Sequence, residues 1–181
     1  MGEAREAMAS WIGTLSSGGV LRSDLEEAGV SVATYVVGEE RISELREWAM
    51  AQSPEALQTQ QCAAIEVCIW MANADRKLDP EEAHFLKSII LASHLDTETQ
   101  DALVAAVHDP PSLRNLEKRI QHPVLRELLI ALMWELAEAD GVIDKREEDF
   151  VTGLCVRLEV DAARAKELRD QVVARVSLPP G

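Results

Sequence analysis

Apolar side chains recur along most of this chain at intervals of three and four residues, the spacing that places them on one face of an α-helix. Residues 57–73 and residues 123–139 are so rich in apolar side chains that both helices are expected to be buried at the centre of the fold. Residues 30–37, VSVATYVV, form the one strand-like run, because β-branched side chains dominate it, and a helix imposed by tertiary contacts is the alternative. The other helices are expected at residues 3–15, 23–29, 39–52, 80–93, 96–107, 112–120, 145–159 and 161–176.

The pattern becomes more regular after Ser53 and Pro54, and this change divides the chain in two. Residues 1–55 are predicted to form a mostly helical N-terminal extension, and residues 56–181 a helical domain. Composition agrees with a helical fold, because aromatic residues make up 4% of the chain and there are 9 glycines and 7 prolines. The predicted fold class is all-α, a helical bundle of about seven or more helices.

The formal net charge of −14 restricts the partners that the chain can bind. Phosphate contacts require clustered lysine and arginine, so nucleic acid is not expected as a partner, and neither is direct adhesion to an anionic membrane. The most apolar stretch, residues 62–74, is too short to span a bilayer and carries Glu66. A protein partner with a basic face, or a membrane-associated complex, fits the acidic balance better.

The cysteines and the N-terminal residues indicate a cytoplasmic protein. Cys62, Cys68 and Cys155 lie in apolar runs and lack the CxxC spacing of a thiolate metal site. Reduced, buried thiols in the cytosol fit this pattern best. The first ten residues, MGEAREAMAS, lack the apolar core of a secretory signal.

An internal repeat organises the second part of the chain. Residues 70–85, WMANADRKLDPEEAHF, align with residues 135–150, ELAEADGVIDKREEDF. Each copy is expected to contain a buried helix, an acidic turn and an amphipathic helix, so the bundle is predicted to be built from two pseudo-repeated helical hairpin units. The alignment pairs the acidic residues of the two turns: Asp75 with Asp140, Asp79 with Asp144, and Glu82 with Glu147.

The acidic residues of both turns have the spacing of helix caps. Asp79 followed by Glu82, and Asp144 followed by Glu147, each match a capping box, in which two side chains accept hydrogen bonds from each other's backbone N–H groups. Gly141 suits the left-handed conformation that often follows the end of a helix. Helix capping is therefore the favoured interpretation of these residues.

A metal site is the alternative interpretation of the same turns. Residues 140–147 match the second half of an EF-hand calcium loop, but Leu136 occupies the place of the first ligand. If the two hairpins pack about a pseudo-twofold axis, the carboxylates of both turns converge and require a divalent cation to neutralise them. A solvated acidic surface competes with that arrangement. The candidate metal ligands are Asp75, Asp79, Asp140, Asp144, Glu82 and Glu147.

No catalytic signature stands out in the sequence. Glu81 and His84 have the Glu-x-x-His spacing of di-iron bundles, but the repeat places Arg146 and Asp149 at the equivalent positions. No serine or cysteine has a neighbouring base in a recognisable motif, and no glycine-rich phosphate loop is present. We therefore expect a protein that is not an enzyme and that has no cofactor other than a divalent cation at the acidic turns.

Two tryptophans and two glutamates lie inside the two most apolar helices. Trp70 and Trp134 are expected in the core rather than at an interface. Glu66 and Glu135 are expected at a helix edge, or paired with an arginine such as Arg126.

The doubled acidic motif resembles the TerB-like family of helical tellurite-resistance proteins, to which a helical domain that precedes the J-domain of some membrane co-chaperones is related. Residues 139–147, ADGVIDKRE, match the motif, and residues 74–82, ADRKLDPEE, keep both aspartates and the glutamate but have Arg76 in place of the glycine. The resemblance covers residues 56–176. It implies an all-α bundle of two related halves, a role in bacterial stress response, and an acidic site that has been associated with metal ions.

These observations leave two main hypotheses for the function. The first is a non-enzymatic stress-response protein that acts as an acidic interaction or scaffold module for a protein partner. An exposed apolar groove between the two halves, flanked by acidic residues, would favour it. The second is a divalent-metal sensor that uses the paired acidic turns, and a di-iron enzyme is a third, more distant alternative.

Overall fold

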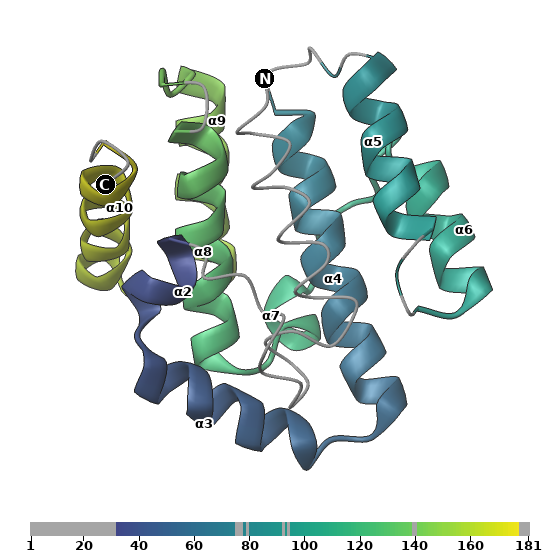
Figure 1. Ribbon diagram of the computed structural model, residues 1–181, viewed down its shortest axis with the longest axis horizontal. Helices are drawn as coiled ribbons and strands as arrows, with labels where there is room; N and C mark the ends of the chain where they lie inside the picture. The colour runs from purple at the N-terminus through teal and green to yellow at the C-terminus, as the bar shows by residue number, and fades with distance from the viewer. Residues whose placement is uncertain are drawn as a thin grey trace.

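The computed structural model describes residues 32–74, 78, 80–91, 93, 95–138 and 141–177. Every element of secondary structure within these residues is an α-helix, which confirms the predicted all-α fold class (Figure 1). The helices are α2 (Val32–Val37), α3 (Glu39–Met50), α4 (Pro54–Ala72), α5 (Pro80–Leu91), α6 (Thr97–Ala106), α7 (Leu116–Arg119), α8 (Pro123–Glu138), α9 (Lys145–Arg157) and α10 (Ala162–Val176).

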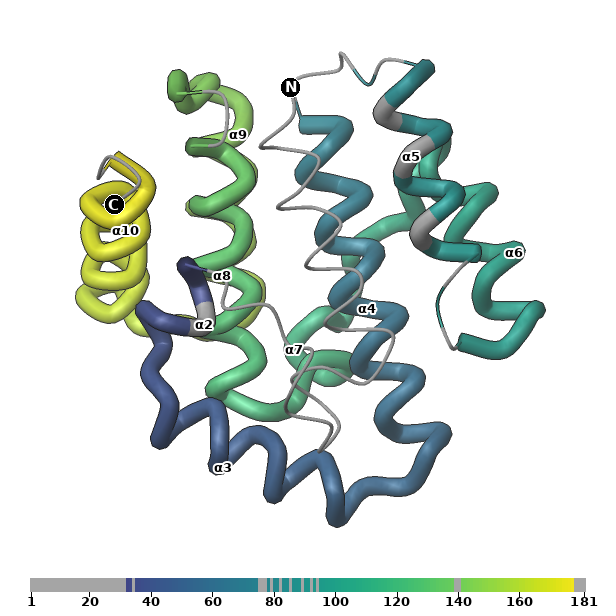
Figure 2. The backbone as a smooth tube through the Cα atoms, in the orientation of Figure 1, coloured from purple at the N-terminus to yellow at the C-terminus, as the bar shows by residue number. Residues whose placement is uncertain are grey.

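Two central helices, α4 and α8, hold the bundle together. Helix α8 packs against α2, α3, α4, α9 and α10, and α4 packs against α6, α7, α8 and α9. The tube view shows α5 and α6 on one side of α4, with α2 and α10 toward the opposite side of the molecule (Figure 2). Helix α3 crosses one end of the bundle, at the bottom of the view. The two helices that are most apolar in sequence therefore each pack against four or more other helices.

Helix α4 is apolar nearly all round because it belongs to two hydrophobic clusters. Its residues Ala64, Val67 and Cys68 lie in the larger cluster, which also takes in α2, α3, α8, α9 and α10. Its residues Ile65 and Ile69 lie in a smaller cluster with α5 and α6. A helix that buries opposite faces has no room for a polar stripe, so the central position predicted for residues 57–73 is confirmed.

The strand predicted for residues 30–37 is wrong, because Val32–Val37 form helix α2. The backbone N–H groups of Val32 and Ala33 donate to the carboxylate of Glu135 on α8, at 3.4 and 3.2 Å, and this satisfies donors that a helix start leaves free. Val36 and Val37 are buried against the same cluster as α8. Tertiary contacts therefore override the strand preference of the β-branched side chains.

Side chains cap the starts of α4, α6 and α10. Ser53 accepts from the N–H of Ala56 at 3.2 Å, Asp96 from that of Thr99 at 2.9 Å, and Asp161 from that of Ala163 at 2.9 Å. The helices expected at residues 3–15 and 23–29 lie outside the described residues.

The helix expected at residues 112–120 is shorter than predicted, since α7 covers only Leu116–Arg119. Ser112 does not cap it. Instead Leu113 is buried in the core with its carbonyl bound to Arg157, and Asn115, with φ of 54°, begins the helix. Ser112 and Leu113 therefore lie outside the helix.

Within the described part of the chain, no helix is long and apolar enough to cross a membrane.

Glu66 pairs with Arg119 at 2.7 Å rather than with Arg126, and Glu135 accepts hydrogen bonds from the backbone at the start of α2. The equivalence of the two hairpin units stays a prediction, because much of the first acidic turn lies outside the described residues.

Candidate functional site

The turn between α8 and α9 has the geometry of a helix cap. Gly141 takes the left-handed conformation, with φ of 77°, and its N–H donates to the carbonyl of Glu138 at 2.8 Å. Asp144 accepts from the N–H of Arg146 at 2.8 Å, and Glu147 accepts from the N–H of Asp144 at 2.9 Å, which completes the capping box. The sequence prediction for these two carboxylates as caps is confirmed.

The metal alternative stays a hypothesis. Among the described residues, no three His, Cys, Asp or Glu side chains come together in a way that could hold an ion. That finding does not bear on most of the candidate ligands, because their side chains are not described. Asp75, Asp79 and Asp140 lie outside the described residues, and Glu82 lies in α5 with its side chain undescribed.

Replacement of Asp144 by alanine is expected to lower the free energy of unfolding by about 1 kcal/mol, because the first turn of α9 loses its N-cap. Urea denaturation followed by circular dichroism measures the loss. The matched control is Asp149→Ala, which removes an exposed pair with Lys145 on the same helix and should cost less than about 0.5 kcal/mol. Equal losses in the two variants would contradict the capping role.

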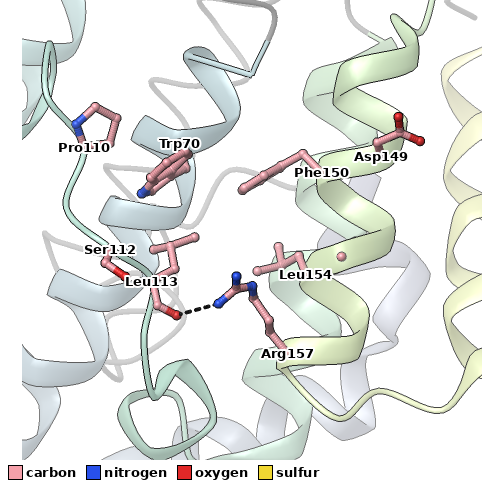
Figure 3. A pocket seen from close by; sticks show the side chains of 9 residues that line it. Trp70, Pro110, Ser112, Leu113, Asp149, Phe150, Leu154 and Arg157 are labelled. Carbon is pink, nitrogen blue, oxygen red and sulfur yellow. Dashed lines mark hydrogen bonds between the residues drawn. The ribbon is translucent and has the colours of Figure 1, made fainter.

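A pocket opens between α4 and α9, on the side where the segment from α6 to α7 passes (Figure 3). Its volume is about 490 Å³, which is within the range of ordinary ligand pockets. The residues around it come from all three segments: Trp70 from α4, Pro110, Ser112 and Leu113 from the connecting segment, and Asp149, Phe150, Gly153, Leu154 and Arg157 from α9.

An aromatic pair lies at this pocket. The rings of Trp70 and Phe150 are within 10° of parallel, with their centroids 6.5 Å apart. The indole N–H of Trp70 donates to the carbonyl of Pro111 at 2.6 Å, which fixes the orientation of the ring. Both side chains stay partly exposed. Trp70 was expected in the core, whereas Trp134, 3% exposed, is the tryptophan that is buried there.

Gly153 keeps the α9 side of the pocket open. It lies inside the helix, and a Cβ atom at this position would have nothing within 4 Å. A glycine inside a helix costs about 1 kcal/mol relative to alanine, and no close packing here requires it. The absence of a side chain therefore leaves space that an alanine or a larger residue would begin to fill.

Arg157 supplies a cation to a pocket that is otherwise mainly apolar. Its guanidinium points into the space below Trp70 and Phe150, and one N–H donates to the carbonyl of Leu113 at 3.2 Å (Figure 3). Arg157 makes no ion pair with any carboxylate in the described ranges. Asp149 points away from the pocket in the same view, and its carboxylate pairs with Lys145 at 2.7 Å.

The three thiols are free and are poor nucleophiles. Burial raises the pKa of Cys62 and that of Cys155 to about 11, and it raises the pKa of Cys68 to about 12. At neutral pH such thiols are almost entirely protonated, and the thiolate is the reactive form. This arrangement gives none of them the properties of a catalytic cysteine.

Alkylation of the folded protein by iodoacetamide at pH 7.5 is expected to be at least tenfold slower than alkylation in urea, because roughly 0.1% or less of each thiol is ionised. Mass spectrometry of the modified chain measures it. A thiol pKa that is higher in the folded state stabilises the fold below the unfolded pKa, and this stabilisation is lost as the pH rises toward 11 or 12. Rapid labelling of the folded chain at pH 7.5 would be inconsistent with these pKa values.

Comparison with known proteins assigns residues 61–170 to one family. The family model described as "Tellurite resistance protein TerB" matches residues 61–170, which is more than half of the chain. The curated proteins and the solved structures gave no match. The matched region includes both acidic turns and all the residues that line the pocket. The resemblance read from the doubled acidic motif is therefore confirmed.

Proposed function

The chain belongs to the TerB family of tellurite resistance proteins, and from this premise we propose that it is a non-enzymatic interaction module that docks a protein partner in the pocket between α4 and α9. The role is that of a scaffold in a cytoplasmic stress response. The observation that carries the proposal is a pocket of about 490 Å³ with two partly exposed aromatic side chains, held open by a glycine inside a helix.

The aromatic pair supports docking of a protein. Tryptophan and other aromatic residues are enriched where protein partners bury their anchor side chains, and a few such anchors account for most of the binding free energy. Trp70 is fixed by its hydrogen bond to Pro111, so little conformational freedom is lost when a partner binds. Leu113 and Leu154 extend the apolar surface below the pair, and both are nearly buried.

The charge of the protein supports a partner with a basic face. A net charge of −14 produces a negative field that accelerates the approach of a positively charged surface. Such a field affects the rate of association more than the final affinity. The proposed partner therefore carries a basic surface for approach and an apolar anchor for the pocket.

Two substitutions at Gly153 test the docking site. Gly153→Leu places an apolar side chain in the pocket, and Gly153→Ala is the matched control, because alanine and leucine have similar helix propensities. Both variants should be more stable than the natural chain by about 0.5–1 kcal/mol in urea denaturation, since neither meets an obstacle at the Cβ position.

Affinity capture with chemical cross-linking, using the tagged full chain, then separates docking from folding. A partner that docks in the pocket should be recovered by the natural chain and by Gly153→Ala, and lost with Gly153→Leu. Recovery of the same proteins by all three chains would place docking elsewhere. If no protein is recovered by any of the three, the interaction module itself is contradicted.

A further inference from the structure

We propose that the pocket between α4 and α9 binds the C-terminal residue of the partner, an apolar residue whose side chain contacts Trp70 and Phe150 and whose α-carboxylate pairs with Arg157. This inference rests on the proposed function and specifies the chemistry of the partner. It follows from three features of the pocket: a guanidinium that pairs with no carboxylate of the described residues, apolar side chains beside it, and a volume of about 490 Å³.

The first step concerns the desolvation of Arg157. Arg157 is exposed, and its guanidinium lies between Leu113 and Leu154 in Figure 3, so a group that fills the pocket removes part of the water around it. Removing water from a cation costs free energy unless an anion or several hydrogen-bond acceptors replace the water. A purely apolar anchor would replace none of it, so this cost would weaken its binding. An anchor that brings its own carboxylate replaces the lost water with an ion pair.

The second step concerns the geometry of Arg157. A guanidinium has five N–H donors in one plane, and the Leu113 carbonyl uses one of them at 3.2 Å. That bond holds the guanidinium in the pocket, and the donors that no described residue uses can bind the two oxygens of a carboxylate in parallel. The position of Arg157 therefore favours a planar, two-oxygen anion over a single neutral acceptor.

The third step concerns why the anion belongs to a chain end. An apolar side chain and a carboxylate must reach the same small volume, and a C-terminal residue carries both on one Cα atom. An internal segment would carry the apolar side chain and the carboxylate on separate residues. Its backbone would also have to enter the pocket and leave it again. Capture of a terminal carboxylate is a known mode of peptide recognition, and the pocket has the chemistry for it.

The acidic character of the protein does not oppose this local contact. Asp149 is the one carboxylate among the described residues that line the pocket, and it points away and pairs with Lys145. Long-range attraction of a basic surface and short-range pairing with one carboxylate act at different distances. A partner can therefore be basic overall and still present its terminal carboxylate to Arg157.

The test uses the full chain and synthetic peptides. The probes are acetyl-Ala-Ala-Leu with a free carboxylate, the same peptide as its C-terminal amide, and acetyl-Ala-Leu-Glu-Ala as an amide, which carries an internal carboxylate. Titration followed by NMR reports on the indole N–H of Trp70 and the backbone N–H groups of Phe150 and Gly153. The free acid should bind about tenfold or more tightly than either amide.

Two variants identify the cause of that preference. Arg157→Gln should bring the affinity for the free acid down to that for its amide, while shifts at Trp70 persist. Gly153→Leu should abolish binding of all three peptides, and because it leaves Arg157 in place it separates a blocked pocket from a lost charge. A melting curve for each variant verifies that it is folded.

Three outcomes would overturn the inference. If acid and amide bind equally at the pocket, the carboxylate is not recognised, although the pocket can still be the docking site proposed above. If the internal-carboxylate peptide binds as tightly as the free acid, the anion is not a chain end. If no peptide shifts the signals at the pocket, terminal capture is wrong, and the cross-linking comparison of Gly153→Leu with Gly153→Ala still decides the docking site separately.

Discussion

A chain shortened to residues 56–181 is expected to lose its cooperative unfolding transition. Helices α2 and α3 contribute to the same hydrophobic cluster as α8, so their removal exposes that cluster to water. Burial of one large apolar side chain stabilises a fold by about 1.5–3 kcal/mol, and a whole domain has a stability of about 5–15 kcal/mol. Among the described residues, the buried apolar side chains removed are those of Ala33, Val36, Val37, Ile42, Leu45 and Ala49.

Urea denaturation of the shortened and the full chain, followed by circular dichroism and by tryptophan fluorescence, measures this effect. The shortened chain starts inside α4 and lacks its cap, so a chain that starts at Ser53 is the matched control for that loss. The chains that start at residue 56 and at Ser53 should both lack a cooperative unfolding transition. A full chain with Leu45→Ala should keep a cooperative unfolding transition, and its free energy of unfolding should fall by about 2–5 kcal/mol. A sharp transition for residues 56–181 near that of the full chain would contradict the shared core.

The result also tests where the folding unit begins. Sequence patterning places a boundary near residue 55, and the family match starts at residue 61. The boundary stays a prediction, because patterning detects a change in regularity and not which faces pack. Val32 and Ala33 donate to Glu135, about a hundred residues along the chain, and no local pattern connects them.

Local signals were predicted well because the forces behind them are local. The capping box of Asp144 and Glu147 involves residues three positions apart, so the spacing alone indicates the geometry. The central positions of α4 and α8 follow from apolar side chains on all faces. In contrast, the strand predicted at residues 30–37 failed because Val32–Val37 pack against α8 and α10, which lie far along the chain and leave no local pattern.

The pocket could not be predicted, since three separate segments form it. Periodicity assigns Trp70 and Phe150 to apolar faces, but it does not show that those faces meet at an opening rather than in the core. Leu113 was assigned to a helix, but it lies before α7 and supplies the carbonyl that holds Arg157. One signal was present in the sequence: Gly153 lies inside the helix predicted at residues 145–159, where a glycine costs about 1 kcal/mol relative to alanine.

Replacement of Arg126 is the second change that should lower the stability of the protein strongly. Arg126 was considered as an ion-pair partner for Glu66 or Glu135, but its guanidinium instead donates to three backbone carbonyls. These belong to Ile120 at 2.7 Å, Glu117 at 2.6 Å and Leu158 at 3.1 Å. Because Ile120 and Leu158 end α7 and α9, one side chain on α8 ties the ends of two other helices together.

Arg126→Ala is therefore expected to lower the free energy of unfolding by about 3–5 kcal/mol, because hydrogen bonds from a charged donor contribute about 1.5–3 kcal/mol each and these three are coupled. Arg126→Lys should recover little, since an ammonium cannot reach three carbonyls in one plane. The control is Glu159→Gln, which removes only the exposed carboxylate 3.6 Å from Arg126 and should cost less than about 0.5 kcal/mol. Urea denaturation of the three variants measures the free energy of unfolding of each. A large decrease in Glu159→Gln would show that the ion pair contributes most of the stability. A large decrease only in the Arg126 variants would assign that stability to the hydrogen bonds with the carbonyls.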